Sequence, residues 1–398
     1  MKIAHIADLH LGFRKYARQT ARGLNQREAD VANAFRRAVD AIVDAAPDAV
    51  VVAGDLFHAI RPSNPAILDA FNQFRRLREG LPKAPIVIVA GNHDTPRSVE
   101  TGTILTLFEA IPNVHVAARS ARTIVFENLE LAIHCVPHEA ILTTPRPTLR
   151  PEKQVGVLWN VLVTHGEVAG VVPGDRSFME YGGALVEPGD LHADQWNYVA
   201  LGHYHVAQQV TPNAWYAGSL EFVSLNPWGE LREGARLGWG DSKGWLLATL
   251  GDDYASVEFM PVETARRHID LDAIDGTNKS AKELDELIAR AVTGVPETID
   301  DHVVRQLVTS VPLNVARELN HSAIRGFKAR ALHYHVDLRR PELKREVGVA
   351  TPGRRQTLSE LVTDYLTRRD LPHGLDRNAL VELGQHYREQ VERELAEG

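Results

Sequence analysis

The chain has 398 residues, of which 44% are hydrophobic and 24% are charged, and its formal net charge is −8. These proportions are ordinary for globular proteins and exclude collagen, a continuous coiled coil and wholesale disorder. At about 100–200 residues per domain, the length predicts two or three domains. The acidic balance argues against binding nucleic acid by bulk charge, but it leaves room for a local basic cleft or for a metal ion that supplies positive charge.

The targeting and redox signals of the sequence favour a cytoplasmic protein. No apolar run reaches the roughly 18–20 residues that span a bilayer, so no contact with a membrane is expected. The segment Met1–His5 does not begin the apolar stretch of a signal peptide. The single cysteine, Cys135, excludes an internal disulfide and any zinc site built from cysteines.

Short β-rich runs alternate with helix-like stretches over the first 90 residues. Lys2–Ala7, Ala49–Ala53 and Ile86–Ala90 are predicted strands, and segments 28–46 and 65–79 carry apolar residues at helical spacing. This alternation favours an α/β fold with a parallel sheet, and fully apolar runs are typical of strands buried on both faces. Later runs suit a second sheet packed on the first, as a layered β-sandwich flanked by helices: Thr123–Phe126, Leu131–Val136, Asn160–Thr164 and Tyr198–Leu201. Trp245–Leu250 and Ser256–Met260 resemble the closing strands of the domain.

The sequence changes character after about residue 260. We predict a helix over 280–293, a strand over Val303–Ser310, a linker at Gly348–Arg355 and two amphipathic helices between Thr357 and Glu397. Residues 321–346 hold a basic cluster, made of Arg325, Lys328, Arg330, Arg339, Arg340, Lys344 and Arg345. The expected domains are therefore 1–260, a smaller α+β capping domain at 261–347, and a helical tail at 348–398.

Five short segments place potential metal ligands directly after predicted strands. They are Asp8-Leu9-His10, Gly54-Asp55, Gly91-Asn92-His93-Asp94, Thr164-His165-Gly166 and Gly202-His203-Tyr204-His205. The carboxyl ends of strands in an open α/β sheet are where ions and substrates bind. Each segment alone would more often be a turn, a cap or a surface pair, whereas all five in order indicate one metal site.

The predicted ligands offer oxygen and nitrogen donors and no thiolate. They are Asp8, His10, Asp55, Asn92, His165, His203 and His205. Seven ligands exceed the four of a tetrahedral zinc site, and they suit two divalent ions about 3.5–4 Å apart that share a carboxylate. The donor set favours Mn²⁺, with Fe²⁺ or Zn²⁺ as alternatives.

This ordered set resembles the calcineurin-like metallophosphoesterase superfamily over about residues 1–250. Four stretches further resemble one branch, the SbcD-like nucleases of DNA double-strand-break repair: Ile6–Gly12, Ala53–His58, Ala200–His205 and Trp215–Glu221. The resemblance implies a metal-dependent nuclease, with exonuclease activity on duplex ends and endonuclease activity on single strands. Such an enzyme hydrolyses phosphodiesters with a hydroxide held between two metal ions.

The resemblance also implies a role for each matching residue. One ion would be held by Asp8, His10, Asp55 and His205, and the other by Asp55, Asn92, His165 and His203. His93 would stabilise charge or act as general acid at the scissile phosphate, and Asp94 would orient its ring. His58 would lie near the site, although a loop histidine outside the first ligand shell is an alternative.

The loop after the first two ligands is basic. Between Leu11 and Glu28 it contains no acid and five basic residues: Arg14, Lys15, Arg18, Arg22 and Arg27. We predict DNA contacts at Arg14, Lys15, Arg18 and Arg22, and a further one at Arg61. A solvated basic surface is the alternative.

The resemblance further predicts partners other than DNA. The apolar stripe of the tail helices would dock on an SbcC-type coiled-coil ATPase, or instead pack on the capping domain. A homodimer would form through residues 65–79 and 98–110, although burial in the core is an equal explanation of their apolar faces. The competing functions are a phosphoesterase that acts on a nucleotide or phosphoprotein, and a non-catalytic scaffold on the same fold, although a scaffold would be expected to have lost ligands.

Overall fold

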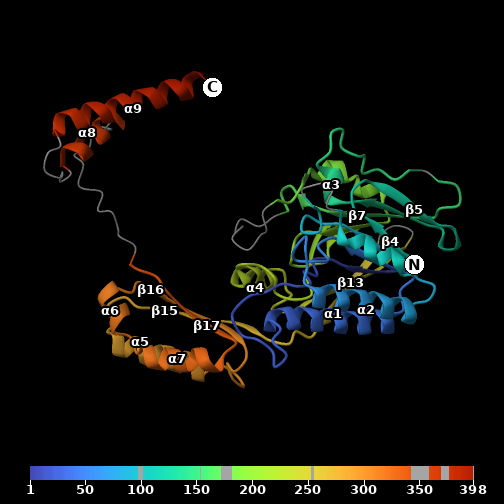
Figure 1. Ribbon diagram of the computed structural model, residues 1–398, viewed down its shortest axis with the longest axis horizontal. Coiled ribbons are helices and arrows are strands. Elements are labelled where there is room, and N and C mark those ends of the chain that lie inside the picture. Colours follow the sequence, from blue (N-terminus) through green and yellow to red (C-terminus); the bar gives the residue numbers. More distant parts are fainter. Residues whose placement is uncertain are drawn as a thin grey trace. The chain divides into compact units, whose positions relative to one another are not determined.

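The protein is described here from a computed structural model (Figure 1), which covers residues 1–96, 102–152, 154–171, 182–251, 255–341, 358–368 and 376–397. The chain divides into two compact units, Met1–Arg340 and Pro341–Gly398. The predicted linker at 348–355 and two members of the basic cluster, Lys344 and Arg345, lie outside the described residues. The boundaries predicted near 260 and 347 stay predictions.

The first sheet has six strands, and four of them are parallel. Its order is β14 (Ser256–Val262), β13 (Lys243–Thr249), β1 (Lys2–Ile6), β2 (Ala49–Ala53), β3 (Ile86–Val89) and β4 (Val114–Ala117). Strands β1 to β4 run parallel, whereas β13 is antiparallel to both β1 and β14. The two predicted closing strands therefore extend this first sheet on the far side of β1.

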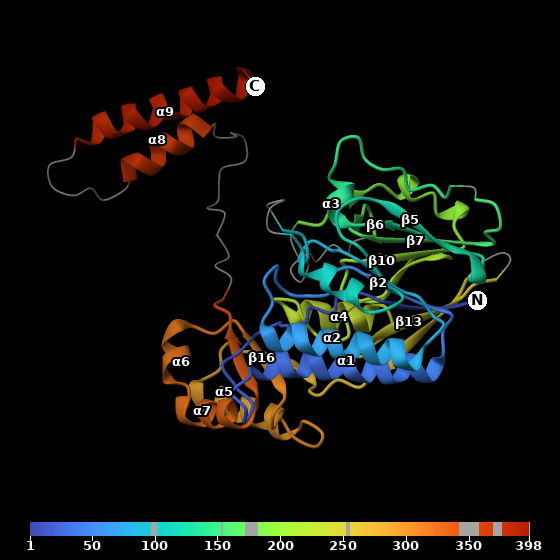
Figure 2. The same cartoon turned by 45° about the vertical axis from the view of Figure 1, so that its right-hand side comes forward.

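Two helices cover the outer face of the first sheet. α1 (Gln26–Ala45) and α2 (Asn64–Gly80) lie side by side on it, as Figure 2 shows. Val50 and Val52 of β2 pack in the helix-facing core, and Val51 packs in the core on the opposite face of the strand. This burial on both faces is the physical reason why β2 is apolar at every position.

The second sheet packs against the inner face of the first. Its order is β11 (Gln208–Thr211), β12 (Ala214–Tyr216), β10 (Tyr198–Gly202), β7 (Trp159–His165), β6 (Leu131–Val136) and β5 (Arg122–Phe126). The core between the sheets joins residues far apart in the chain, including Ile3, Val51, Val87, Ile133 and Val163. The predicted layered α/β sandwich is therefore confirmed.

Smaller elements lie between the strands of these sheets. They are the paired β8 (Glu167–Val168) and β9 (Leu185–Val186), α3 (His138–Ile141) and α4 (Pro227–Arg236). The paired strands and α3 contribute to the apolar cluster that includes Leu162 and Leu201 of the second sheet. α3 follows the end of β6 and thus lies next to the ends of the strands that carry the predicted ligands.

A third sheet follows, and its strands are all parallel. It consists of β15 (His268–Asp275), β16 (Val303–Thr309) and β17 (His333–Leu338). α5 (Ala281–Thr293), α6 (Leu313–Glu318) and α7 (His321–Arg330) alternate with these strands, and Leu284, Ile288 and Ile324 share one core with Val304 and Val308. The prediction from sequence included α5 and β16 and missed β15 and β17, although polar and apolar residues alternate along both of those strands as in a half-buried strand.

The second unit consists of α8 (Leu358–Arg368) and α9 (Arg377–Glu397), as predicted for the tail. The two helices approach closely, because a Cβ on Gly384 of α9 would lie 2.5 Å from Leu366 Cδ1 of α8. Among the helices in the described parts of the chain, none has the length and hydrophobicity to cross a bilayer. The cytoplasmic location stays a prediction.

Candidate metal centre

The carboxyl ends of five strands bring the predicted ligands together. Asp8 and His10 follow β1, Asp55 follows β2, Asn92 follows β3, His165 ends β7, and His203 and His205 lie just beyond β10. Ligand atoms of Asp8, His10 and His205 lie within 4.8 Å of one another, and so do those of Asp8, Asp55 and His165. Residues separated by up to 197 positions in the chain thus share one buried cluster.

Asn92 and His203 complete the cluster on the side of the second sheet. The Asn92 Oδ1 atom lies 2.9 Å from His165 Nε2 and 3.1 Å from His203 Nδ1. Asp55 Oδ2 lies between the two halves, 3.4 Å from His165 Nε2 and 3.7 Å from His10 Nε2. The structure therefore gathers all seven predicted ligands, with the Asp55 carboxylate at the shared position.

The donor set fits divalent cations. His10 Nε2 and His205 Nε2 face each other at 3.1 Å, as two nitrogen ligands of one ion would. Asp55 Oδ2 and His203 Nε2 are buried and have no hydrogen-bond partner in the part of the chain that the structure describes. Buried polar atoms without partners are costly. A cation beside Asp55 would remove that cost at its carboxylate.

An unusual backbone conformation accompanies four of the predicted ligands. Asp8, His10, Asp55 and His203 have φ values of 52°, 46°, 50° and 104°, in or near the left-handed region that non-glycine residues rarely adopt. Such strain clusters at functional sites, where the surrounding structure imposes it. At Gly91 a Cβ atom would overlap the Asp55 carboxylate, so only glycine allows this close approach.

The protonation states suit metal binding. Burial lowers the pKa of His203 to about 3 and holds the pKa values of His10 and His205 well below the usual range, so these imidazoles are neutral. Burial also acts to lower the pKa of His165, but the charge of Asp55 outweighs it and raises that pKa to about 9. Imidazole ligands must be unprotonated, so metal binding would require His165 to release its proton.

His93 and His58 lie together beside the cluster. The ring atom His93 Nδ1 lies 2.7 Å from the His58 carbonyl oxygen and donates to it, while His93 N donates to Asp55 Oδ1 at 2.9 Å. His58 Nδ1 also lies 3.3 Å from His10 Nδ1. His58 thus contacts both His93 and His10, and its half-buried side chain lies beside the cluster.

The Asp94 carboxylate binds the backbone of two loops. It accepts N–H groups at 3.0–3.2 Å, from Leu56, Phe57 and Gly91. The His93 ring is held by the His58 carbonyl, which accepts from its Nδ1. Asp94 therefore ties the loop after β2 to the loop after β3, and its expected role in orienting the His93 ring stays a prediction.

The five predicted DNA contacts do not form one free patch. Arg14 pairs with Glu28 at 2.7 Å, Lys15 donates to the Ser224 and Leu225 carbonyls, and Arg18 donates to the Ala329 and Ala331 carbonyls. Tyr16 of the same loop stacks on His333 with ring centroids 4.1 Å apart. Tyr16 and Arg18 thus join this loop to the third sheet and its helix α7, whereas Arg22 and Arg61 are exposed.

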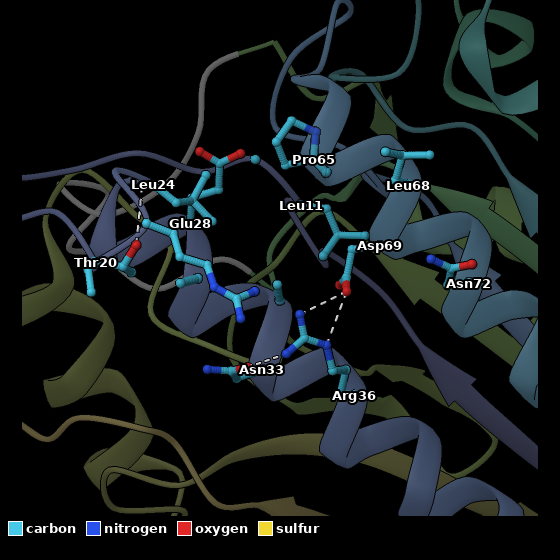
Figure 3. A pocket seen from close by; sticks show the side chains of 16 residues that line it. Leu11, Thr20, Leu24, Glu28, Asn33, Arg36, Pro65, Leu68, Asp69 and Asn72 are labelled. Carbon is cyan, nitrogen blue, oxygen red and sulfur yellow. Dashed lines mark hydrogen bonds and ion pairs between the residues drawn. The ribbon is translucent and has the colours of Figure 1, made fainter.

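Among the cavities lined by described residues, two large ones lie near the ligands. One, of about 560 Å³, is bounded by α1, α2 and the loop that carries Arg22, and none of the seven ligands lines it (Figure 3). The other, of about 590 Å³, is lined by Asn92, His93, His138 and Leu142 among others. The second cavity opens directly beside His93 and is the candidate substrate cleft.

His138 is a cleft residue that the sequence analysis missed. It begins α3 just beyond the end of β6, and its buried Nδ1 atom has no hydrogen-bond partner among the described residues. Burial lowers the pKa of His138 to about 4, so the ring is neutral. The same signal that identified the ligands, a histidine directly after a predicted strand, is present here at Val136-Pro137-His138.

Comparison with known proteins agrees with this geometry. The model of the calcineurin-like phosphoesterase family matches residues 1–207, a range that includes all seven ligands. DNA double-strand break repair protein Mre11 of Methanococcus maripaludis is 28% identical over 72% of this chain and 73% of its own length. The proteins of the same name from Methanocaldococcus jannaschii and Sulfolobus acidocaldarius are 26% and 23% identical, over 66% and 92% of this chain and 67% and 90% of their own lengths. Among solved structures, a dimetal phosphatase from Danio rerio aligns with a TM-score of 0.37 and 11% identity, over 67% of this chain and 99% of that one.

Proposed function

Because this chain belongs to the calcineurin-like phosphoesterase family, we propose that it is a two-metal DNA nuclease of double-strand-break repair. Family membership makes it a metal-dependent phosphodiesterase, as the sequence predicted. The observation that carries the proposal is the convergence of the seven ligands and His93 beside one cleft. The proposed substrate class comes from the relatives, which are named DNA double-strand break repair proteins. The matches to this chain cover 73% and 90% of the lengths of two of them.

The ligands divide into two sets that share Asp55. Asp8, His10 and His205 would hold one ion with Asp55, and Asn92, His165 and His203 would hold the other with it. Two divalent ions neutralise the charge of a phosphodiester and lower the pKa of water toward neutrality. The donor set favours Mn²⁺, with Fe²⁺ or Zn²⁺ as alternatives.

His93 is proposed to act on the scissile phosphate. Because His93 Nδ1 donates to the His58 carbonyl, the contact with substrate falls to the other ring nitrogen, Nε2. The His93 side chain lines the cleft, while its backbone is anchored to Asp55. A ring fixed in this way can stabilise developing charge on the phosphate or protonate the leaving oxygen.

The enzymatic test is digestion of end-labelled DNA by the purified full chain. With Mn²⁺ we expect cleavage of blunt duplex ends and of single strands, and with EDTA none. Nucleotides and a phosphopeptide, supplied at the same concentration, should be hydrolysed far more slowly. Preferential hydrolysis of either small substrate would instead support the competing phosphoesterase function, and the absence of any hydrolysis with Mn²⁺, Fe²⁺ or Zn²⁺ would support the scaffold.

Arg22 and Arg61 are the proposed contacts to DNA phosphates. Removing one basic side chain that binds a phosphate should weaken binding to any sequence and reduce the slope of log K against log salt by about 0.7–0.9. We expect this change for Arg22→Ala and for Arg61→Ala in anisotropy titrations at several salt concentrations. Arg75→Ala, on an exposed side chain of α2 that pairs with Glu79, is the matched control and should leave the slope unchanged.

The partners are also proposals. The exposed side chains Leu68 of α2 and Leu107, 64% and 38% accessible, suit a homodimer through the helices predicted for it; part of the second segment, 98–101, lies outside the described residues. Tyr365, Leu383 and Tyr387 of the tail are half or more exposed and suit an SbcC-type coiled-coil ATPase. Sedimentation velocity should show a dimer for the full chain alone and a larger complex when that ATPase is added. A chain that stays monomeric and does not bind the ATPase would contradict both the proposed homodimer and the proposed ATPase complex.

A further inference from the structure

A buried polar chain lies behind one of the metal ligands. The His205 Nδ1 atom lies 3.2 Å from Ser224 Oγ, and Ser224 Oγ donates to Glu230 Oε2 at 2.5 Å. Lys243 forms an ion pair with the other oxygen of Glu230. The Lys243 ammonium also donates to the His205 carbonyl at 2.8 Å and to Ser219 Oγ at 3.1 Å. These contacts hold both the ring and the backbone of His205.

The direction of the hydrogen bonds follows from the chemistry of each group. A serine hydroxyl has one proton, and Ser224 gives it to the Glu230 carboxylate. Its oxygen can then only accept from His205, so the imidazole must carry its proton on Nδ1. The tautomer that remains has an unprotonated Nε2, the atom that faces His10 Nε2. The carboxylate of Glu230 therefore sets the tautomer of His205 through one intervening hydroxyl.

The burial of this chain argues that it is more than incidental packing. Ser224 and Glu230 are each 1% exposed and Lys243 is 4% exposed. A buried ion pair offsets its desolvation cost only when the geometry and the additional hydrogen bonds are good. Here the extra bonds of both charged groups go to His205 or to a residue that contacts it. The ion pair is thus arranged around the ligand.

We propose that Ser224 and Glu230 are positioning residues that fix His205 for the ion shared with Asp8, His10 and Asp55. This inference rests on the proposed metal centre. The effect should be confined to one of the two sites, because His165 is oriented independently by the Ala53 carbonyl, which accepts from its Nδ1 at 2.9 Å. Partners of this kind change metal affinity about 10- to 100-fold when they are removed.

The test is calorimetric titration of the metal-free full chain with MnCl₂. For Ser224→Ala we expect one of the two Mn²⁺ sites to weaken about 10- to 100-fold while the other is unchanged. Ser224→Thr retains the hydroxyl and should bind closer to wild type than Ser224→Ala does. Ser219→Ala is the matched control. It removes a buried hydroxyl that lies 3.2 Å from the His205 carbonyl and does not contact the imidazole, while the backbone N–H of residue 219 and the Lys243 ammonium still donate to that carbonyl, so both sites should keep wild-type affinity.

A second readout separates positioning from general destabilisation. In protein labelled with ¹⁵N-histidine, the His205 ring should show the Nδ1–H tautomer in wild type and in Ser219→Ala, and a mixture of tautomers in Ser224→Ala. Wild-type Mn²⁺ affinity in Ser224→Ala, or equal weakening in Ser219→Ala, would overturn the positioning role alone. Failure of the wild-type chain to bind Mn²⁺ would overturn the proposed metal centre itself, and the two failures are therefore distinguishable.

Discussion

Replacing His93 with alanine should remove most turnover while leaving both metal sites intact. His93 lines the cleft with its side chain, and proton transfer or charge stabilisation by such a group contributes about 10²–10⁴-fold to rate. Its link to the ligands is made by the backbone N–H, which donates to Asp55 Oδ1, and alanine retains that group. We therefore expect His93→Ala to lower turnover without lowering the affinity for metal.

The measurement combines kinetics with metal binding. Turnover of an end-labelled duplex with saturating Mn²⁺ should fall by about 10²–10⁴-fold in His93→Ala, while calorimetry should still detect two bound ions. His115→Ala, which alters a half-buried histidine on β4 away from the cluster, should retain wild-type turnover. Full nuclease activity in His93→Ala would contradict the proposed role, and loss of bound metal would show that the ring supports the ligands instead.

Asp55→Ala should abolish metal binding and activity together. The Asp55 carboxylate contacts ligands of both proposed ions, because its Oδ2 atom lies near His10 on one side and His165 on the other. Removing it takes away a shared negative charge and leaves neighbouring imidazoles that repel a cation once protonated. The loss of affinity should exceed the roughly 100-fold that marks the upper end for an indirect partner.

Thermal denaturation provides the readout for this variant. A ligand that binds only the folded state raises the melting temperature, so Mn²⁺ should stabilise the wild-type protein. The same addition should leave the melting temperature of Asp55→Ala unchanged. Asp40→Ala changes an exposed carboxylate that pairs with Arg76 and should behave like wild type. A normal Mn²⁺-dependent shift in Asp55→Ala would show that the ions bind elsewhere.

Much of the fold and the ligand set could be predicted from local patterns. Apolar runs such as Ala49–Ala53 predict buried strands, because a strand that packs against hydrophobic neighbours on both faces is apolar at every position. A polar residue just after such a run lies at the end of a strand, and Asp55 and His165 are two such residues; they became candidate ligands because five such segments occur in order. That all five strand ends lie at one edge follows from the parallel pairing of β1, β2 and β3 and of β7 and β10.

The partners of charged side chains could not be predicted in this way. Lys15 and Arg18 lie in a basic loop beside the site, yet they bind carbonyl groups more than 200 residues further along the chain. Asp94 follows His93 directly, but its carboxylate turns to the backbone of the loop after β2. The sequence shows which residues are neighbours along the chain. The hydrogen-bond partners of a buried polar group are instead the donors and acceptors that the folded chain places around it.

The sequence by itself therefore determined the α/β sandwich, the family and the set of proposed metal ligands, because strand periodicity and strand-end chemistry are local properties. Only the tertiary structure decided what surrounds those ligands. It placed the His58 carbonyl against His93, Ser224 and Glu230 behind His205, and the basic loop against the third sheet. Each of these contacts joins segments distant in the chain, and their geometry exists only after the sheets have packed.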